Sequence, residues 1–440
     1  MKYECFLAVL AFFVLSCGKK EKRQGGNTDP FLNCAGYFEE HKKLALEDGG
    51  KLWGISLYGP LLFIDQNTRQ VYANQPSSLL GLQWEHGVYT GKLPDSIPMA
   101  NTAMSFDGTY WTMMLLPLPE NSSRRRALMM HESFHSVQPT LGFDFSKIDF
   151  YSCNHLNEKK GRVYLKLELE ALKMAMNESE AGQIMQHIDN AILFRLYRYD
   201  LYPKYAASEN AMELLEGIPE YTGLLMSGLD RAGIQAYYAT NVNRFYASRS
   251  FVRSFAYHTM PAYGYLMQGR DPKWNKKIDV YTNLTSYIMD FYGIKRPRNL
   301  EYEVDIVKYD YGFAEIMEAE NARELQTQQQ MKNFRDLFFK TPTLKFHSDQ
   351  LSYAINPESV IPLEPEGTIF QNLTITAEWG VLQVNDNYVF IGKENDYGIL
   401  AELLEINKAG AVGKGWELYL KNGWHVVKGN SDYLIEEIKP

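Results

Sequence analysis

Residues 131–135 read His-Glu-Ser-Phe-His within a run of helix-forming residues, and this short segment constrains the chain more than any other. Residues four apart on a helix lie on one face, so His131 and His135 can present their ring nitrogens to one metal ion, as in zinc sites. Glu132 projects about 100° round the helix from His131, where a carboxylate can take a proton from a metal-bound water. The segment therefore predicts half of a zinc site together with its general base.

Local signals bracket this helix. Asn121, Ser122 and Ser123 can cap its N-terminus, and Pro139 disfavours helical geometry at Gln138. These limits predict a helix of roughly 15 residues with the motif in its last turns. The alternative interpretation is two solvated or core histidines on an amphipathic helix, and a third ligand is needed to decide between them.

Four carboxylates offer that ligand about eighty residues later. Glu209, Glu213, Glu216 and Glu220 follow one another at spacings of four, three and four, which places them on one face of a helix. Like charges stacked this way repel one another, and a cation relieves the repulsion. The alternative is a solvated acidic stripe.

The two segments together resemble the gluzincin class of zinc metallopeptidases. The resemblance implies a zinc ion held by His131, His135 and Glu216. It implies Glu132 as the general base and Glu220 as the acid that orients a histidine ligand through its second ring nitrogen.

Two features depart from familiar members of that class. Leu215 stands before Glu216 where Asn is common, and the interval from the histidines is long. Glu213 is the alternative to Glu216 as the ligand, because spacing alone does not separate two carboxylates on one face. If Glu216 is the ligand, Glu213 is a second acid near the metal.

Hydrolysis of an amide also needs a group that stabilises the oxyanion. The resemblance to zinc peptidases, which often place a Tyr or His after the Glu ligand, makes Tyr257, His258 and Tyr263 the candidates. The alternative for each is packing in the core with a satisfied polar group.

Two further helical segments carry charges among apolar residues. Glu168 and Glu170 lie in one and Arg195 and Arg198 in the other. Because an unpaired buried charge costs several kcal/mol, about 3–5 when one partner is removed, we expect an ion pair between neighbouring helices.

The N-terminus predicts export. Residues 1–16 read as a signal peptide, and Val-Leu-Ser-Cys resembles the bacterial lipobox, which implies cleavage before Cys17 and acylation of that cysteine, as by palmitate. Residues 17–30 read as a flexible tether. These features predict a protein lipid-anchored to a membrane of a bacterial cell envelope; secretory cleavage without lipidation is the alternative.

Two cysteines remain after this processing. In an oxidising compartment Cys34 and Cys153 are candidates for a disulfide. Neither lies in a spacing typical of metal ligands.

The pattern along the chain predicts an α+β protein. Residues 31–120 read as a small β-rich part, with residues 106–116 as an edge strand for extended peptide, and residues 121–338 as a mainly helical, zincin-like catalytic unit. Residues 343–440 read as a β-sandwich or barrel, with Asn422-Gly423 as a hairpin turn.

Composition narrows the function. The chain has 440 residues, 45% of them hydrophobic and 22% charged, and a net charge of -8 without a long basic tract, so nucleic acid is not an expected partner. We therefore predict a membrane-anchored zinc-dependent peptidase or related amide hydrolase, acting on peptide or protein, in which Glu132 activates a zinc-bound water. The alternative is a non-catalytic surface lipoprotein that binds glycan or protein.

Overall fold

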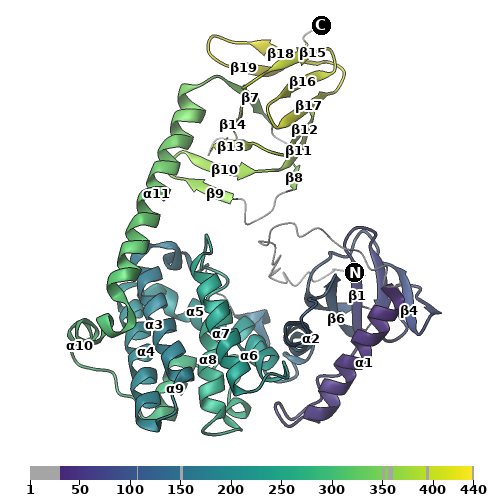
Figure 1. Cartoon of the computed structure of the whole chain (residues 1–440). Helices are drawn as coiled ribbons and strands as arrows, with labels where there is room; N and C mark the ends of the chain where they lie inside the picture. The colour runs from purple at the N-terminus through teal and green to yellow at the C-terminus, as the bar shows by residue number, and fades with distance from the viewer. Residues whose placement is uncertain are drawn as a thin grey trace. The chain divides into compact units, whose positions relative to one another are not determined.

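A computed structural model of the chain describes residues 30–106, 108–148, 152–348, 352–354, 360–392 and 396–438. A small N-terminal sheet is followed by a helical region and then by an all-β region, so the predicted α+β class is confirmed (Figure 1). The chain divides into two compact units, residues 1–320 and residues 321–440. The predicted signal peptide, the lipidated Cys17 and the tether up to residue 29 lie outside the described residues. Within the described ranges, no helix is long and apolar enough to span a membrane.

The first unit opens with a helix, α1 (Pro30–Asp48), where the sequence predicted only β structure. Its buried positions are Cys34, Phe38, His41 and Ala45, spaced four, three and four residues apart, which is the period of a helix. A cysteine, a histidine and an alanine give little hydrophobic contrast, so the sequence pattern does not indicate this helix.

Six strands form the sheet of this unit, in the order β3-β4-β2-β1-β6-β5. The strands are β1 (Leu61–Asp65), β2 (Gln70–Ala73), β3 (Gln83–Glu85), β4 (Val88–Lys92), β5 (Thr102–Phe106) and β6 (Thr109–Leu116). Only the pairing of β1 with β6 is parallel among the described strands of this sheet. Helix α1 covers one face of the sheet, where Cys34 and Phe38 pack on Leu61 and Phe63 (Figure 1).

The prediction that residues 106–116 form an edge strand is wrong. Strand β6 lies between β1 and β5 and pairs with both, and the edge strands of this sheet are β3 and β5. Four consecutive residues of β6, from Trp111 to Met114, are buried, which is typical of an interior strand covered on both faces.

The helical region follows the sheet. Its helices are α2 (Ser122–Val137), α3 (Lys159–Asn177), α4 (Ala181–Leu201), α5 (Ala206–Met212), α6 (Ile218–Leu225), α7 (Arg231–Tyr246), α8 (Ala256–Gln268), α9 (Leu284–Tyr292), α10 (Leu300–Val307) and α11 (Phe313–Lys340). Between α5 and α6 the chain forms a π turn, Glu213–Gly217, without leaving the helical path. One large hydrophobic core joins most of these helices.

The predicted ion pair between neighbouring helices is confirmed for Glu168 of α3. Its two carboxylate oxygens accept hydrogen bonds from Arg195 and Arg198 of α4, each at 2.7 Å, and all three side chains are fully buried. Glu170 does not join this network; it pairs with Lys173 at 2.8 Å near the surface.

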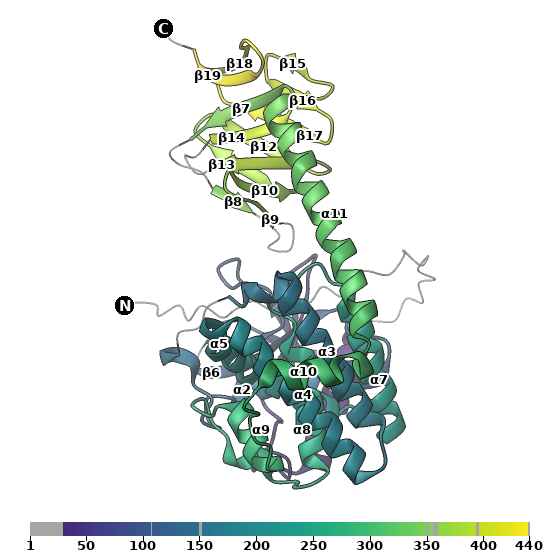
Figure 2. The same ribbon diagram turned by 90° about the vertical axis from the view of Figure 1, so that its left-hand side faces the viewer.

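The second unit contains two sheets, in the orders β18-β19-β7-β14-β13-β10-β9 and β15-β16-β17-β12-β11-β8. The strands are β7 (Thr343–His347), β8 (Ser352–Ala354), β9 (Val360–Leu363), β10 (Gly367–Gln371), β11 (Thr374–Ala377), β12 (Gly380–Val384), β13 (Tyr388–Gly392), β14 (Asp396–Leu400), β15 (Glu405–Asn407), β16 (Gly410–Gly413), β17 (Trp416–Leu420), β18 (Trp424–Lys428) and β19 (Tyr433–Glu437). The sheets pack face to face over one core, with Phe346 and Ile399 from the first and Leu382 and Leu418 from the second (Figure 2).

The boundary between the units falls inside α11, between Glu320 and Asn321, rather than after it. Phe334 and Phe338 of α11 pack on Ile369 and Phe390 of the second unit, so this end of the helix belongs to the β core. The predicted hairpin at Asn422-Gly423 is wrong, because β17 pairs with β12 and β16 while β18 pairs with β19.

Candidate metal centre

Helix α2 carries the motif and begins and ends as its sequence predicts. The side chain of Asn121 accepts a hydrogen bond from the backbone N–H of Arg124 at 3.0 Å, and Gln138 is the C-cap. Helix α6 crosses α2 closely, because a Cβ on Gly223 would lie 2.4 Å from the carbonyl oxygen of Ala127. A glycine at this crossing lets the downstream acidic segment approach the histidines.

An unbroken α-helix would place the four carboxylates of residues 209–220 within about 60° of one another round its axis. The π turn instead directs them to two different sides. The backbone N–H of Ile218 bonds to the carbonyl of Glu213, five residues back. The additional residue in the turn rotates the helix beyond it. Glu209 and Glu213 therefore face arginines of α4, whereas Glu216 and Glu220 face the histidines of α2.

Three potential ligand atoms converge at this point. The Nε2 atoms of His131 and His135 lie 3.2 Å apart, and Oε2 of Glu216 lies 3.6 Å from each of them. In a tetrahedral zinc site with bonds of about 2.0–2.1 Å, the ligand atoms are separated by about 3.3–3.4 Å. The three atoms therefore have the spacing of three corners of a zinc tetrahedron.

The other ring nitrogens fix which atoms can bind a metal. Nδ1 of His131 lies 2.9 Å from Oε2 of Glu220, a carboxylate oxygen that accepts. Nδ1 of His135 lies 2.8 Å from Oε1 of Gln138, which also accepts. Each Nδ1 must therefore carry a proton, and Nε2 is the nitrogen of each ring that faces the common point and can bind a metal ion there. Two ring nitrogens and a carboxylate this close fit a bound cation.

The charges around the histidines favour such a cation. Burial lowers the pKa of His131, but Glu216 and Glu220 outweigh it and raise the pKa to about 10. Burial raises the pKa of Glu216, but the two histidines outweigh it and hold the pKa well below its ordinary value. The negative potential that would hold a proton here also attracts a dication.

Glu132 lies beside the two histidines. A carboxylate oxygen of Glu132 and one ring nitrogen of each histidine all lie within 4.8 Å of one another. Burial raises the pKa of Glu132 above its ordinary value. A carboxylate so placed can accept a proton next to a bound metal ion.

Of the three oxyanion candidates, the structure brings only Tyr257 to this point. Its ring stacks on the ring of His131, with centroids 5.5 Å apart and planes 8° apart, and its hydroxyl donates to Oε2 of Glu216. Burial and the nearby Glu216 hold the pKa of Tyr257 well above its ordinary value, so the hydroxyl remains a donor.

His258 and Tyr263 are not brought to the site. The ring of His258 stacks on Phe245 with centroids 4.3 Å apart, and the hydroxyl of Tyr263 donates to Glu168 at 3.0 Å. Tyr263 therefore takes the packing role, with a hydrogen-bonded hydroxyl, that was its alternative interpretation. His258 packs on Phe245, and among the described residues its buried Nδ1 has no hydrogen-bond partner.

Glu213 is excluded as a metal ligand because its carboxylate is already paired with Arg195. It is fully buried and binds the guanidinium of Arg195 through both carboxylate oxygens, at 2.6 and 3.0 Å. Glu216, by contrast, has a carboxylate oxygen 3.6 Å from the Nε2 atoms of both histidines.

The predicted disulfide is also wrong. Cys34 and Cys153 are both buried free thiols, and they belong to different hydrophobic clusters. Burial raises the pKa of the Cys34 thiol to about 12, which makes it unreactive.

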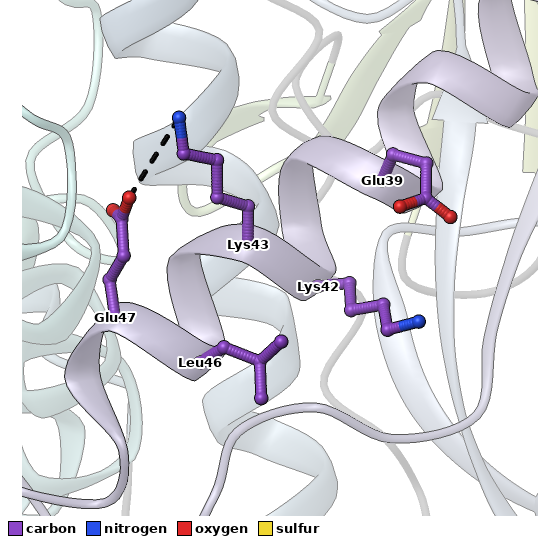
Figure 3. Close-up of a pocket in the computed structure, with 5 residues that line it drawn as sticks. All are labelled: Glu39, Lys42, Lys43, Leu46 and Glu47. Atoms are coloured by element: carbon purple, nitrogen blue, oxygen red, sulfur yellow. Dashed lines mark ion pairs between the residues drawn. The ribbon is translucent and has the colours of Figure 1, made fainter.

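A shallow surface hollow lies elsewhere, along the outer face of α1 (Figure 3). It is lined by Glu39, Lys42, Lys43, Leu46 and Glu47, all of them exposed. Lys43 and Glu47 form an ion pair of 3.8 Å across one turn. Exposed pairs of this kind contribute about 0–1 kcal/mol, and the hollow contains none of the site residues.

Gln138 is the site residue that sequence reasoning missed as part of the chemistry. It stands three positions after the second histidine, where a helix would place it one turn further along the same face. That spacing was a signal, but the residue was interpreted only as a helix end.

Comparisons with protein-family models, with curated proteins and with solved structures find no match to this chain.

Proposed function

We propose that the protein is a zinc-dependent peptidase or related amide hydrolase of the gluzincin type. One observation carries the proposal: two histidine Nε2 atoms and one carboxylate oxygen meet at separations of 3.2 and 3.6 Å. His131, His135 and Glu216 would hold the zinc ion. A zinc ion there would supply Lewis acidity to a substrate carbonyl and lower the pKa of a coordinated water.

The residues around the site divide the remaining work. Glu132 accepts the proton of the attacking water and passes it to the leaving amine, which requires the raised pKa that burial gives it. Tyr257 donates a hydrogen bond, and in the reaction this donor stabilises the negative charge that develops on the carbonyl oxygen. Glu220 and Gln138 hold the two histidine rings in the binding tautomer.

Zinc content and cleavage of a fluorogenic peptide library test the proposal together. We expect about one zinc per chain in the wild type, none in His131→Ala, and one in Glu132→Gln. Cleavage should disappear in His131→Ala and fall by about 10²–10⁴-fold in Glu132→Gln. His347→Ala, at an exposed histidine of the second unit, should change neither property. A metal-free wild type that binds polysaccharide would support the non-catalytic alternative instead.

We also propose, from the sequence alone, that acylated Cys17 anchors the protein to a membrane of the cell envelope. Cys17→Ser should move the protein from the membrane fraction to the soluble fraction of the cell. Retention in the membrane fraction would contradict the anchor.

A further inference from the structure

Gln138 makes three hydrogen bonds that join the two halves of the metal centre. Its Oε1 accepts from Nδ1 of His135 at 2.8 Å. Its Nε2 donates to the carbonyl oxygens of Leu214 and Leu215, each at 3.1 Å. The side chain is buried, with 4% of its surface exposed. One amide therefore connects the second histidine with the turn that carries Glu216.

The two carbonyls accept from Gln138 because of Pro219. In an α-helix the N–H of residue 219 would bond to the carbonyl of residue 215, and in a π-helix to that of residue 214. Proline has no N–H, so it supplies neither bond. Buried carbonyls need a donor, and the Gln138 amide supplies it to both.

This arrangement determines which end of the amide faces the histidine. The carbonyls of Leu214 and Leu215 only accept, so the NH₂ group of Gln138 must face them. Its oxygen then faces His135, whose Nδ1 must donate. The Nε2 atom of His135 is consequently the one left to bind a metal ion, and it lies 3.2 Å from Nε2 of His131 and 3.6 Å from Oε2 of Glu216.

We propose that Gln138 is a positioning residue for the metal centre, and that the π turn with Pro219 is the feature that orients it. The proposal rests on the proposed zinc site. Gln138 fixes the tautomer of His135 and also binds the backbone next to Glu216. One buried side-chain amide thus sets both the separation and the orientation of His135 and Glu216.

Zinc affinity of the full-length protein, measured by competition with a chelator, tests this role. Gln138→Leu should weaken zinc binding by about 10–100-fold, the usual cost of losing a partner of a ligating histidine. The absorption bands of the Co²⁺-substituted variant should also shift, because the ring of His135 is no longer fixed.

Asn275→Leu is the matched control. Asn275 is equally buried, and its amide donates to the carbonyl of Leu52 at 2.8 Å, away from the metal centre. Asn275→Leu should lower the melting temperature about as much as Gln138→Leu does. It should leave the zinc affinity and the Co²⁺ absorption bands unchanged.

Pro219→Ala separates positioning from general stability. It supplies an N–H that competes with Gln138 for the two carbonyls and favours the helix. We expect several-fold weaker zinc binding without a lower melting temperature. If the wild type binds zinc and both Gln138→Leu and Pro219→Ala bind it equally well, the inference is overturned. If the wild type binds no zinc, the proposed function fails, and the inference fails with it.

Discussion

At the residue scale, the ring nitrogens of His131 and His135 have separate roles that follow from their contacts. Each Nδ1 faces an oxygen that only accepts, so Nε2 is the ring nitrogen of each histidine that is left to bind a metal ion. The two Nε2 atoms lie 3.2 Å apart, with a carboxylate oxygen 3.6 Å from both, and this point favours a proton or a metal cation. The orientation of the two rings thus supports the metal proposal beside the motif.

Tyr257→Phe tests the role of one hydroxyl at this scale. The ring can keep its stacking on His131, while the donor to Glu216 is lost. We expect unchanged zinc content and KM, and a kcat lower by about 10²–10³-fold, the usual cost of one oxyanion donor. Steady-state kinetics on a peptide from the library measures both constants.

Tyr287→Phe serves as the control, because its hydroxyl donates to the backbone of Trp274 at 2.8 Å and not to the metal centre. A Tyr257→Phe protein with wild-type kcat would show that this hydroxyl only orders Glu216.

At the element scale, buried charges hold α4 against α3 and α5. Glu209 of α5 lies 2.6 Å from His155 and accepts from Arg198 at 2.7 Å, with no exposed surface. Burial raises the pKa of Glu209, but Arg198 and His155 outweigh it and lower the pKa from 4.5 to about 2. Removing one partner of such a pair leaves a buried charge uncompensated.

Glu209→Gln should therefore destabilise the helical unit by about 3–5 kcal/mol at neutral pH. A carboxylate whose pKa is lowered by folding stabilises the folded state above its unfolded pKa. The contribution of Glu209 is thus complete above pH 4.5 and is lost as the pH falls toward about 2. Urea unfolding followed by helical circular dichroism, with a chelator present, should show a smaller acid-induced loss in the variant.

Asp200→Asn provides the comparison, since Asp200 pairs with Arg296 at 2.6 Å but is about half exposed. Its effect should stay within about 1 kcal/mol. Equal effects of the two substitutions at neutral pH would contradict the account of the buried network.

The elements that local chemistry determines were predictable from sequence, and those that long-range pairing determines were not. Asn121 and Pro139 are local signals, and α2 begins and ends beside them. The order of the first sheet depends on the parallel pairing of β1 with β6, which no local pattern indicates. Asn422-Gly423 has the composition of a hairpin turn, but the strands on its two sides do not pair with each other. Strand β17 pairs with β16, and β18 pairs with β19.

The arrangement of the candidate site was predictable to a similar degree. The histidines and Glu132 share one helix, so periodicity alone placed them. The choice of Glu216 over Glu213 depends on a π turn, and an additional residue in a helical turn has no compositional signature. The choice of Tyr257 over Tyr263 depends on how α8 faces its neighbours, which requires the packed structure.

At the scale of the whole molecule, the chain comprises two units with separate cores. The β unit encloses Trp379 and Trp416, both at most 2% exposed, between its sheets. The C-terminal part of α11 adds Phe334 and Phe338 to a smaller cluster of the same unit. The β unit should therefore fold alone when this part of α11 is included.

Two fragments test this division. Residues 321–440 should unfold cooperatively in urea, and residues 342–440 should be less stable by at least about 3 kcal/mol, the low end of the cost of truncating one buried Phe. Circular dichroism measures both transitions. Equal stability of the fragments would show that α11 contributes nothing to the β core.

X-ray absorption at the zinc edge of the purified full-length protein tests the central claim most directly. We predict about one zinc per chain, with four nitrogen or oxygen neighbours at about 2.0–2.1 Å and the outer-shell scattering of two imidazole rings. His135→Ala should remove that signal. A protein without zinc, or zinc with sulfur neighbours at about 2.3 Å, would contradict the site formed by His131, His135 and Glu216.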